Sequence, residues 1–208
     1  MIEIIEKKSH WLFPTLLYEG QVSDLTICDR LEKAILDSEE YKNRNLEERC
    51  YNSNDKLQND PNFKELSDLI LSNSKHLLDE FGVVRDSHYI SNMWAVIQHP
   101  SYRHMRHIHP NCLFSGIFYV RAPENCANII FDNPKPTRTL QPDYSFNSAV
   151  NSGTWYVKPR AGKIMLWPSD LPHSVDVGYN DENDPRISIA FNIMITGEIK
   201  TRSANLIL

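Results

Sequence analysis

The chain has 208 residues, of which 24% are charged and 41% hydrophobic, and its formal net charge is −5. This length can bury a sizeable core within one domain, and the acidic balance disfavours an extended nucleic acid as partner because no basic stripe follows a phosphate backbone. The four cysteines form no C-x-x-C pair, which disfavours a zinc ribbon or a redox dithiol and is typical of reduced thiols inside a cell.

No segment has the character of a membrane span or a secretion signal. The start, "MIEIIEKKSHWLF", has no uninterrupted apolar stretch after a basic beginning, and no later stretch approaches the length needed to cross a bilayer. We therefore expect a soluble, cytoplasmic protein without a membrane partner. The oligomeric state is not indicated.

Residues 1–87 are predicted to be a mainly helical support region. Residues 11–20 form an apolar, extended entry segment, and a first helix begins near 23 with Ser23 as its cap. A polar link precedes a second helix, which Pro61 opens and Gly82 closes. The apolar stripes are Leu25, Leu31, Ile35 and Leu36 in the first helix, and Phe63, Leu66, Ile70, Leu77 and Phe81 in the second.

Residues 88–208 are predicted to be a β-rich core. About eight short strands, rich in β-branched and aromatic residues and without intervening helices, favour an antiparallel jelly roll, also called a double-stranded β-helix. The predicted strands are 88–98, 106–109, 115–122, 127–133, 154–159, 162–168, 173–179 and 186–195. We expect one domain over 1–208, mainly β, with the helices packed on one sheet. The polar insert 132–154 is either a lid over a substrate or a solvated excursion.

Three histidines in "HMRHIHPN" are the first candidates for chemistry. If 106–109 is a strand, His107 and His109 project from the same face, as a pair of metal ligands requires, and a regular strand would turn His104 to the opposite face. An H-x-H pair alone is weak evidence, because two surface histidines also produce it.

A third ligand and an anion-binding residue are predicted farther along the chain. In "GKIMLWPSDLPHSV", His173 opens a strand after a turn held by two prolines; otherwise it is a capping or core histidine. The alternation of residues 186–195 places Arg186 and Ser188 on one face with small or polar residues. A buried guanidinium must be paired, and the partner is either the carboxylate of a ligand or an internal carboxylate, namely Asp132, Asp170 or Asp176.

The combined pattern resembles the iron(II)- and 2-oxoglutarate-dependent oxygenases. "WAVIQHPSYRHMRHIHPNCLFSGIFYV", "IIFDNP", "GKIMLWPSDLPHSV" and "RISIAFN" are similar to a small group of 2-oxoglutarate-Fe(II) oxygenases whose motif reads HxHPxxxxSGxxYV. The "FPT" start and the "FKELSDLI" helix also fit that group. The resemblance therefore extends over nearly the whole chain.

The resemblance implies a role for each matching position. His107, His109 and His173 would bind Fe(II), and Arg186 with Ser188 would hold the distal carboxylate of 2-oxoglutarate. Gln98, Tyr102 and Tyr119 lie where relatives place polar contacts to this cosubstrate. Dioxygen would be the second cosubstrate, and hydroxylation of a small-molecule or peptide substrate would release succinate and carbon dioxide.

One ligand departs from the superfamily, in which an aspartate usually occupies the position of His109. A neutral imidazole there raises the charge of the metal unit by one, which strengthens the attraction for a dianion but makes zinc or copper more competitive. Alternatively His109 only lines the site, or Asp176 or another carboxylate is the third ligand. Asp176 is disfavoured because it is three residues beyond His173 and so on the opposite face of a strand.

Two other functions stay open. A cupin-like enzyme could use the three histidines without 2-oxoglutarate, although it would leave Arg186 and Ser188 without a purpose and lacks the glutamate that usually follows H-x-H. A jelly-roll binding module with a structural metal is the non-catalytic alternative. The aromatic residues are either core or a wall that shields the site, and core is preferred for most of them: Phe114, Phe118, Phe131, Trp155 and Trp167.

Overall fold

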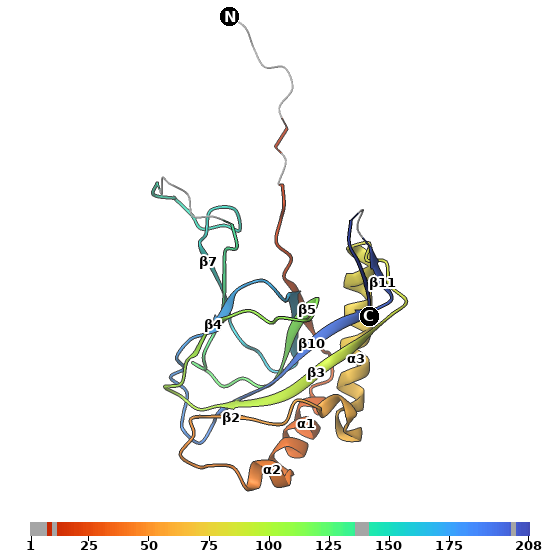
Figure 1. The fold of residues 1–208 in the computed structure, drawn as a ribbon. Helices are drawn as coiled ribbons and strands as arrows, with labels where there is room; N and C mark the ends of the chain where they lie inside the picture. Colours follow the sequence, from red (N-terminus) through yellow and green to blue (C-terminus); the bar gives the residue numbers. More distant parts are fainter. Residues whose placement is uncertain (1–7, 10–11, 136–141, 201–202) are drawn as a thin grey trace, which may run out of the picture.

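The computed structural model describes residues 8–9, 12–135, 142–200 and 203–208 (Figure 1). Part of the N-terminal segment and residues 136–141 of the insert lie outside this description. The helices are α1 (Thr26–Asp37), α2 (Glu39–Lys42) and α3 (Lys64–Glu80), with 3₁₀ turns at Leu57–Asn59 and Pro61–Phe63. The strands are β1 (Tyr18–Gln21), β2 (Cys50–Asn52), β3 (Ser87–Gln98), β4 (His104–His107), β5 (Phe114–Arg121), β6 (Ile129–Asp132), β7 (Thr154–Val157), β8 (Lys163–Pro168), β9 (His173–Val175), β10 (Arg186–Thr196), β11 (Glu198–Lys200) and β12 (Asn205–Ile207).

Two antiparallel sheets face each other, as a jelly roll requires. The larger sheet has the order β1-β8-β5-β10-β3-β2 and the smaller sheet the order β4-β9-β6-β7, while β11 and β12 form a separate ribbon. Figure 1 shows α1 and α3 on the far side of the larger sheet from β4 and β7. The predicted fold, a mainly β jelly roll with helices on one sheet, is confirmed.

The alternation of β10 separates two environments. Ile187, Ile189, Phe191, Ile193 and Ile195 lie in the core between the larger sheet and the helices. The opposite face, which carries Arg186 and Ser188, turns toward the smaller sheet. Between the sheets is a second apolar cluster that includes Tyr119, Phe131, Met165 and Trp167. The predicted period-two pattern of this strand is therefore confirmed, and it directs the polar residues into the space between the sheets.

The helices follow the predicted stripes, with differences at their ends. Ser23 does not cap α1; instead the Asp24 carboxylate accepts from the backbone N–H of Thr26 at 2.9 Å. The predicted first helix is interrupted at Ser38, which has extended backbone and caps α2. Leu25 and Phe81 are each about half exposed, and not members of the buried stripes as expected, because Leu25 precedes the first turn of α1 and Phe81 follows the last turn of α3.

The strands differ from the predicted ranges mainly in the small sheet. The predicted strand 106–109 is β4, which ends at His107, and β9 is shorter than 173–179. The sequence did not indicate β2, β11 or β12, each only three residues long. Among the described residues, no helix is long and apolar enough to cross a membrane.

Candidate metal centre

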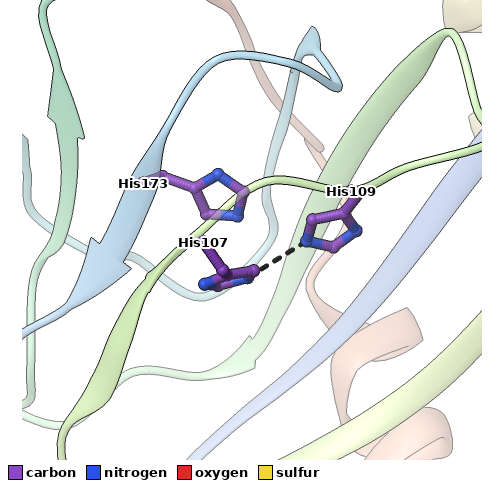
Figure 2. Close-up of side chains that lie close together, drawn as sticks. All are labelled: His107, His109 and His173. Carbon is purple, nitrogen blue, oxygen red and sulfur yellow. Dashed lines mark hydrogen bonds between the residues drawn. The ribbon is translucent and has the colours of Figure 1, made fainter.

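Three imidazoles converge between the two sheets (Figure 2). His107, His109 and His173 each offer one ring nitrogen, and the three nitrogens lie within 4.8 Å of one another. His173 is 4% exposed, and the other two are partly buried. In the described part of the chain this is the one group of three or more potential metal-ligating side chains close enough to share an ion.

The three histidines come from two strands and a loop. His107, the last residue of β4, pairs directly with His173 of β9, so their rings lie side by side with centroids 4.3 Å apart. His109 lies beyond the end of the strand, and its backbone N–H donates to the carbonyl of Ser169 at 2.9 Å. The two rings lie close together as expected, but the predicted reason, alternation along one strand, is wrong because β4 ends at His107. The loop brings the two rings together, and the contact with Ser169 holds this loop.

Each ring presents its Nε2 atom to the shared point. The Nδ1 atoms of His107 and His173 lie 2.8 and 3.0 Å from the carbonyl oxygens of Met105 and Leu171. A carbonyl only accepts, so both Nδ1 atoms carry the proton and both Nε2 atoms keep a free lone pair. Nδ1 of His109 lies 2.8 Å from Oδ1 of Asn192. This arrangement of outer hydrogen bonds is typical of metal-bound histidines.

Burial disfavours the charged form of two of these rings, His173 and His109. Burial lowers the pKa of His173 to about 3, and it also lowers the pKa of His109. The Nε2 atoms of His107 and His109 are 3.2 Å apart. Two lone pairs facing each other at that distance repel, and a cation between the rings would relieve the repulsion. The donor set of three neutral imidazoles therefore fits a divalent transition metal.

His104 is not on the opposite face, as a regular strand predicts. A register shift between His104 and His107 bends β4, and the two rings are tilted with centroids 4.4 Å apart. Burial, followed by the charge of neighbouring His107, lowers the pKa of His104 to about 4. His104 is thus part of the imidazole cluster, although it does not join the group of three.

Arg186 is buried on the inner face of the larger sheet, across from His107 and His173, without an acidic partner. It is 2% exposed, and its NH1 donates to the carbonyl of Ala127 at 3.2 Å. No described carboxylate lies within ion-pair distance of it. The internal partners considered from the sequence are engaged elsewhere or exposed: Asp132 pairs with Arg106, Asp176 pairs with Arg103, and Asp170 is exposed. Asp176 is also not among the three side chains that could hold a metal together.

Further polar groups near Arg186 are also without partners. Nε of Arg186, Oγ of Ser188 and the hydroxyl of Tyr119 are buried without a hydrogen bond. Ser188 and Tyr119 are direct neighbours across β10 and β5, and the guanidinium carbon lies 5.7 Å from the Tyr119 ring centroid. Buried polar groups in proteins are nearly always paired, so three orphans together indicate a binding site for a polar ligand.

Gln98 and Tyr102, the other two residues expected to contact the cosubstrate, lie near Arg186 but differ from Ser188 and Tyr119 in their hydrogen bonds and burial. Gln98 pairs with Arg186 across β3 and β10, and its side-chain amide donates to the carbonyl of Tyr102 at 2.9 Å. Tyr102 itself is partly buried, and burial raises the pKa of its phenol. The structure thus places both residues at the Arg186 end of the space between the sheets.

The aromatic residues divide between two faces. Phe114 and Phe118 pack in the helix-side core, so neither lines the site. Phe131 and Trp167 lie against His173, with ring centroids 6.0 and 4.9 Å from it. Trp155 is 45% exposed, so it is not a core residue. Of the five aromatic residues that could shield the site, only Phe131 and Trp167 contact one of the three histidines.

The sequence reading missed the polar residues behind His109. Asn192, Ser115 and Ser169 are buried and connected by hydrogen bonds, and Trp94 stacks on the His109 ring with centroids 5.9 Å apart. Asn192 shares the inner face of β10 with Arg186 and Ser188. The continuation of this polar face to Asn192 was a signal in the sequence that could have identified it as a residue of the site.

Comparisons with known proteins agree with this geometry. Residues 92–192 match the model of a family described as "Putative 2OG-Fe(II) oxygenase", where 2OG is 2-oxoglutarate. No curated protein sequence matches the chain.

Solved structures share the fold at low sequence identity. The epimerase SnoN from nogalamycin biosynthesis has a TM-score of 0.64 and 12% identity, over 91% of this chain and 80% of its own. A Pseudomonas putida prolyl-4-hydroxylase has a TM-score of 0.61 and 10% identity, over 88% and 94% of the two chains. HygX from Streptomyces hygroscopicus, with nickel and 2-oxoglutarate bound, has a TM-score of 0.57 and 11% identity, over 91% and 89%. The part of the chain that matches the 2OG-Fe(II) oxygenase family model, residues 92–192, is thus the part that holds the three histidines and Arg186.

Proposed function

We propose that this protein is an Fe(II)- and 2-oxoglutarate-dependent dioxygenase that hydroxylates a small molecule or a peptide side chain. The single observation that carries the proposal is the buried Arg186, which lacks an acidic partner and borders the same space between the sheets as the three converging imidazoles. A metal site alone would not need this cation. A cosubstrate with a carboxylate at its far end accounts for both.

His107, His109 and His173 would hold the iron through their Nε2 atoms. Their Nδ1–H groups are held by two backbone carbonyls and one side-chain amide, so the rings are oriented before the metal arrives. When bound, iron supplies the redox chemistry that couples oxidative decarboxylation of 2-oxoglutarate to oxidation of a substrate C–H bond. Three neutral ligands leave the full charge of the metal to attract a dianion.

Arg186 would bind the distal carboxylate of 2-oxoglutarate. A planar guanidinium matches a carboxylate through two parallel hydrogen bonds, and its unpartnered Nε is a free donor. Ser188 and Tyr119 would donate from their unpartnered hydroxyls. Gln98 and Tyr102 would close the same end. His104, within electrostatic range of Arg186, would line the path between the metal and this cation.

The surrounding side chains would exclude water and orient the reactants. Trp167 and Phe131 pack against His173, and Trp94 covers one face of His109. Proteins with this fold include a prolyl-4-hydroxylase and an epimerase, so the fold alone does not specify the reaction. The family match and the unpartnered groups around Arg186 support the use of iron and 2-oxoglutarate, and hydroxylation is the reaction that we propose for them. The single-domain arrangement, with 1–87 as support and 88–208 as catalytic core, is part of the same proposal.

A three-histidine enzyme that does not use 2-oxoglutarate is the second candidate, favoured by the lack of a carboxylate among the clustered ligands. It leaves the three unpartnered polar groups around Arg186 without an occupant. A non-catalytic binding module has the same difficulty.

Anaerobic absorption spectroscopy distinguishes these functions. Fe(II) with 2-oxoglutarate should give a weak visible charge-transfer band that is lost in His107→Ala and His173→Ala and weakened in Arg186→Ala. His76→Ala, on the exposed side of α3, is the matched control and should keep the band. Absence of a band in the wild-type protein, together with no succinate release in air, would overturn the proposal.

A further inference from the structure

We propose that the side-chain amide of Asn192 is a positioning group that makes His109 a metal ligand, and that Ser115 and Asn92 fix the orientation of this amide. The inference rests on the proposed metal centre and concerns how its third ligand is specified. Asn192 is buried on β10, where it lies between the His109 ring and the strand β3.

Both polar atoms of the Asn192 side chain have hydrogen-bond partners, and these partners agree with a single orientation of the amide. Oδ1 lies 2.8 Å from Nδ1 of His109 and 2.8 Å from Oγ of Ser115, and Nδ2 donates to Oδ1 of Asn92 at 2.8 Å. An amide oxygen has two acceptor positions, so the two donors fill it. His109 must then carry its proton on Nδ1, which leaves Nε2 free.

Exchanging the positions of Oδ1 and Nδ2 of Asn192 would favour the opposite tautomer of His109. Nδ2 would face His109, whose Nδ1 would have to accept, and the ring proton would move to Nε2, where it blocks metal binding. The Asn192 oxygen would also face the Asn92 oxygen, and two acceptors at that distance repel. Oγ of Ser91 lies 3.1 Å from the Asn92 oxygen and 3.3 Å from the backbone carbonyl oxygen of Asn192, so its single proton is shared between two acceptors. The pair Asn92–Asn192 therefore selects one tautomer of His109.

A second set of contacts supports the amide from the other side. Oγ of Ser115 lies 2.9 Å from Oγ of Ser169, and Oγ of Ser169 lies 3.1 Å from the thiol of Cys112. Since a hydroxyl has one proton, Ser115 donates to Asn192 only if Ser169 donates to Ser115. The backbone of Ser169 also accepts from the N–H of His109. Ser169 thus holds the loop of His109 through its backbone, and through its side chain it supports the hydrogen bonds from Ser115 to Asn192 behind the His109 ring.

His109 differs in this respect from the other two histidines. His107 and His173 donate to backbone carbonyls, which do not depend on side-chain identity. The ligand that replaces the usual carboxylate is the one held by a side chain, and this side chain is neutral. Asn192 therefore specifies a ligand at His109 without returning a negative charge to the centre.

Two substitutions of similar volume separate positioning from structural support. Asn192→Leu removes the acceptor, and Asn192→Asp keeps it. In the apo-protein titrated with Co(II), we expect Asn192→Leu to bind about 10- to 100-fold more weakly, the usual cost of losing an outer-shell partner, while Asn192→Asp stays within a few-fold of wild type. Equal losses in both variants, accompanied by equal falls in melting temperature, would overturn the inference, as would wild-type affinity in Asn192→Leu.

The tautomer can be read directly in wild-type protein, so the test does not depend on how the variants fold. Nitrogen NMR of ¹⁵N-histidine-labelled, metal-free protein should show His109 protonated at Nδ1 and bare at Nε2, and an Nε2-protonated ring would refute the inference. His107→Ala distinguishes a failure of the proposed metal centre from a failure of the proposed role of Asn192. If it binds Co(II) normally, the metal centre itself fails; if it loses Co(II) while His109→Ala does not, only the role of Asn192 fails.

Discussion

Replacing Arg186 with methionine is predicted to change two measurable quantities independently. In the metal-free protein the guanidinium is buried with one hydrogen bond to a carbonyl and an unpartnered Nε. Substituting a buried charge with an apolar side chain of similar size is often neutral or stabilising by about 1–4 kcal/mol. The melting temperature of metal-free Arg186→Met should therefore be unchanged or higher.

The same substitution should greatly weaken binding of 2-oxoglutarate. Removing one partner of a buried, hydrogen-bonded charge pair costs about 2–5 kcal/mol. That range corresponds to an affinity about 30- to 4,000-fold lower, since each 1.4 kcal/mol is about tenfold. Isothermal titration of 2-oxoglutarate into Mn(II)-loaded protein under argon measures this loss, and thermal unfolding of the metal-free protein measures stability.

Arg30→Met is the matched control, because Arg30 is an exposed arginine paired with Glu65. It should leave both quantities near the wild-type values. A clear fall in the melting temperature of Arg186→Met, with 2-oxoglutarate affinity unchanged, would refute the reasoning. Arg186 would then be an ordinary structural residue.

Three further predictions concern single residues. Ser188→Ala should leave stability unchanged but weaken 2-oxoglutarate binding about 10- to 100-fold, the value of a hydrogen bond to a charged group, because its hydroxyl has no partner in the protein; a large loss of stability with normal binding would contradict this. Gly116→Ala should lower the melting temperature by about 2–12 °C through overpacking, since a Cβ there would lie 2.3 Å from Cζ of Phe191 and 2.6 Å from the carbonyl oxygen of Met165; an unchanged melting temperature would show that the strands can separate. Because the pKa of folded His173 is lowered to about 3, the unfolded state binds more protons below about pH 6.5, so metal-free protein loses stability as pH falls from 6.5 toward 3. Between pH 7 and 5 this one group should cost about 2 kcal/mol, and denaturant unfolding should show a correspondingly smaller loss in His173→Gln; identical pH profiles would contradict the assignment.

The β core was predictable because periodicity alone determines it. Along β10 the alternation of branched and polar residues correctly divided the helix-side core from the face that carries Arg186 and Ser188. Three-residue strands such as β2 have too few positions for a period to show, and β2 exists because its residues pair with the end of β3. Tertiary contacts, not local pattern, specify such segments.

The candidate site was predictable in its members but less so in its geometry. H-x-H, a distal histidine and Arg-x-Ser identified residues that the fold brings to the space between the two sheets. The bend in β4 that returns His104 to the cluster depends on its pairing with β9, which local sequence does not reveal. The position of His109 depends likewise on Ser169, sixty residues away.

Crystallography of the protein with Fe(II) and 2-oxoglutarate under anaerobic conditions tests the central claim most directly. We predict one anomalous iron peak within bonding distance of Nε2 of His107, His109 and His173. The far carboxylate of 2-oxoglutarate should be paired with the Arg186 guanidinium. Iron bound without His109, or 2-oxoglutarate absent from Arg186 while the metal site is full, would contradict the account.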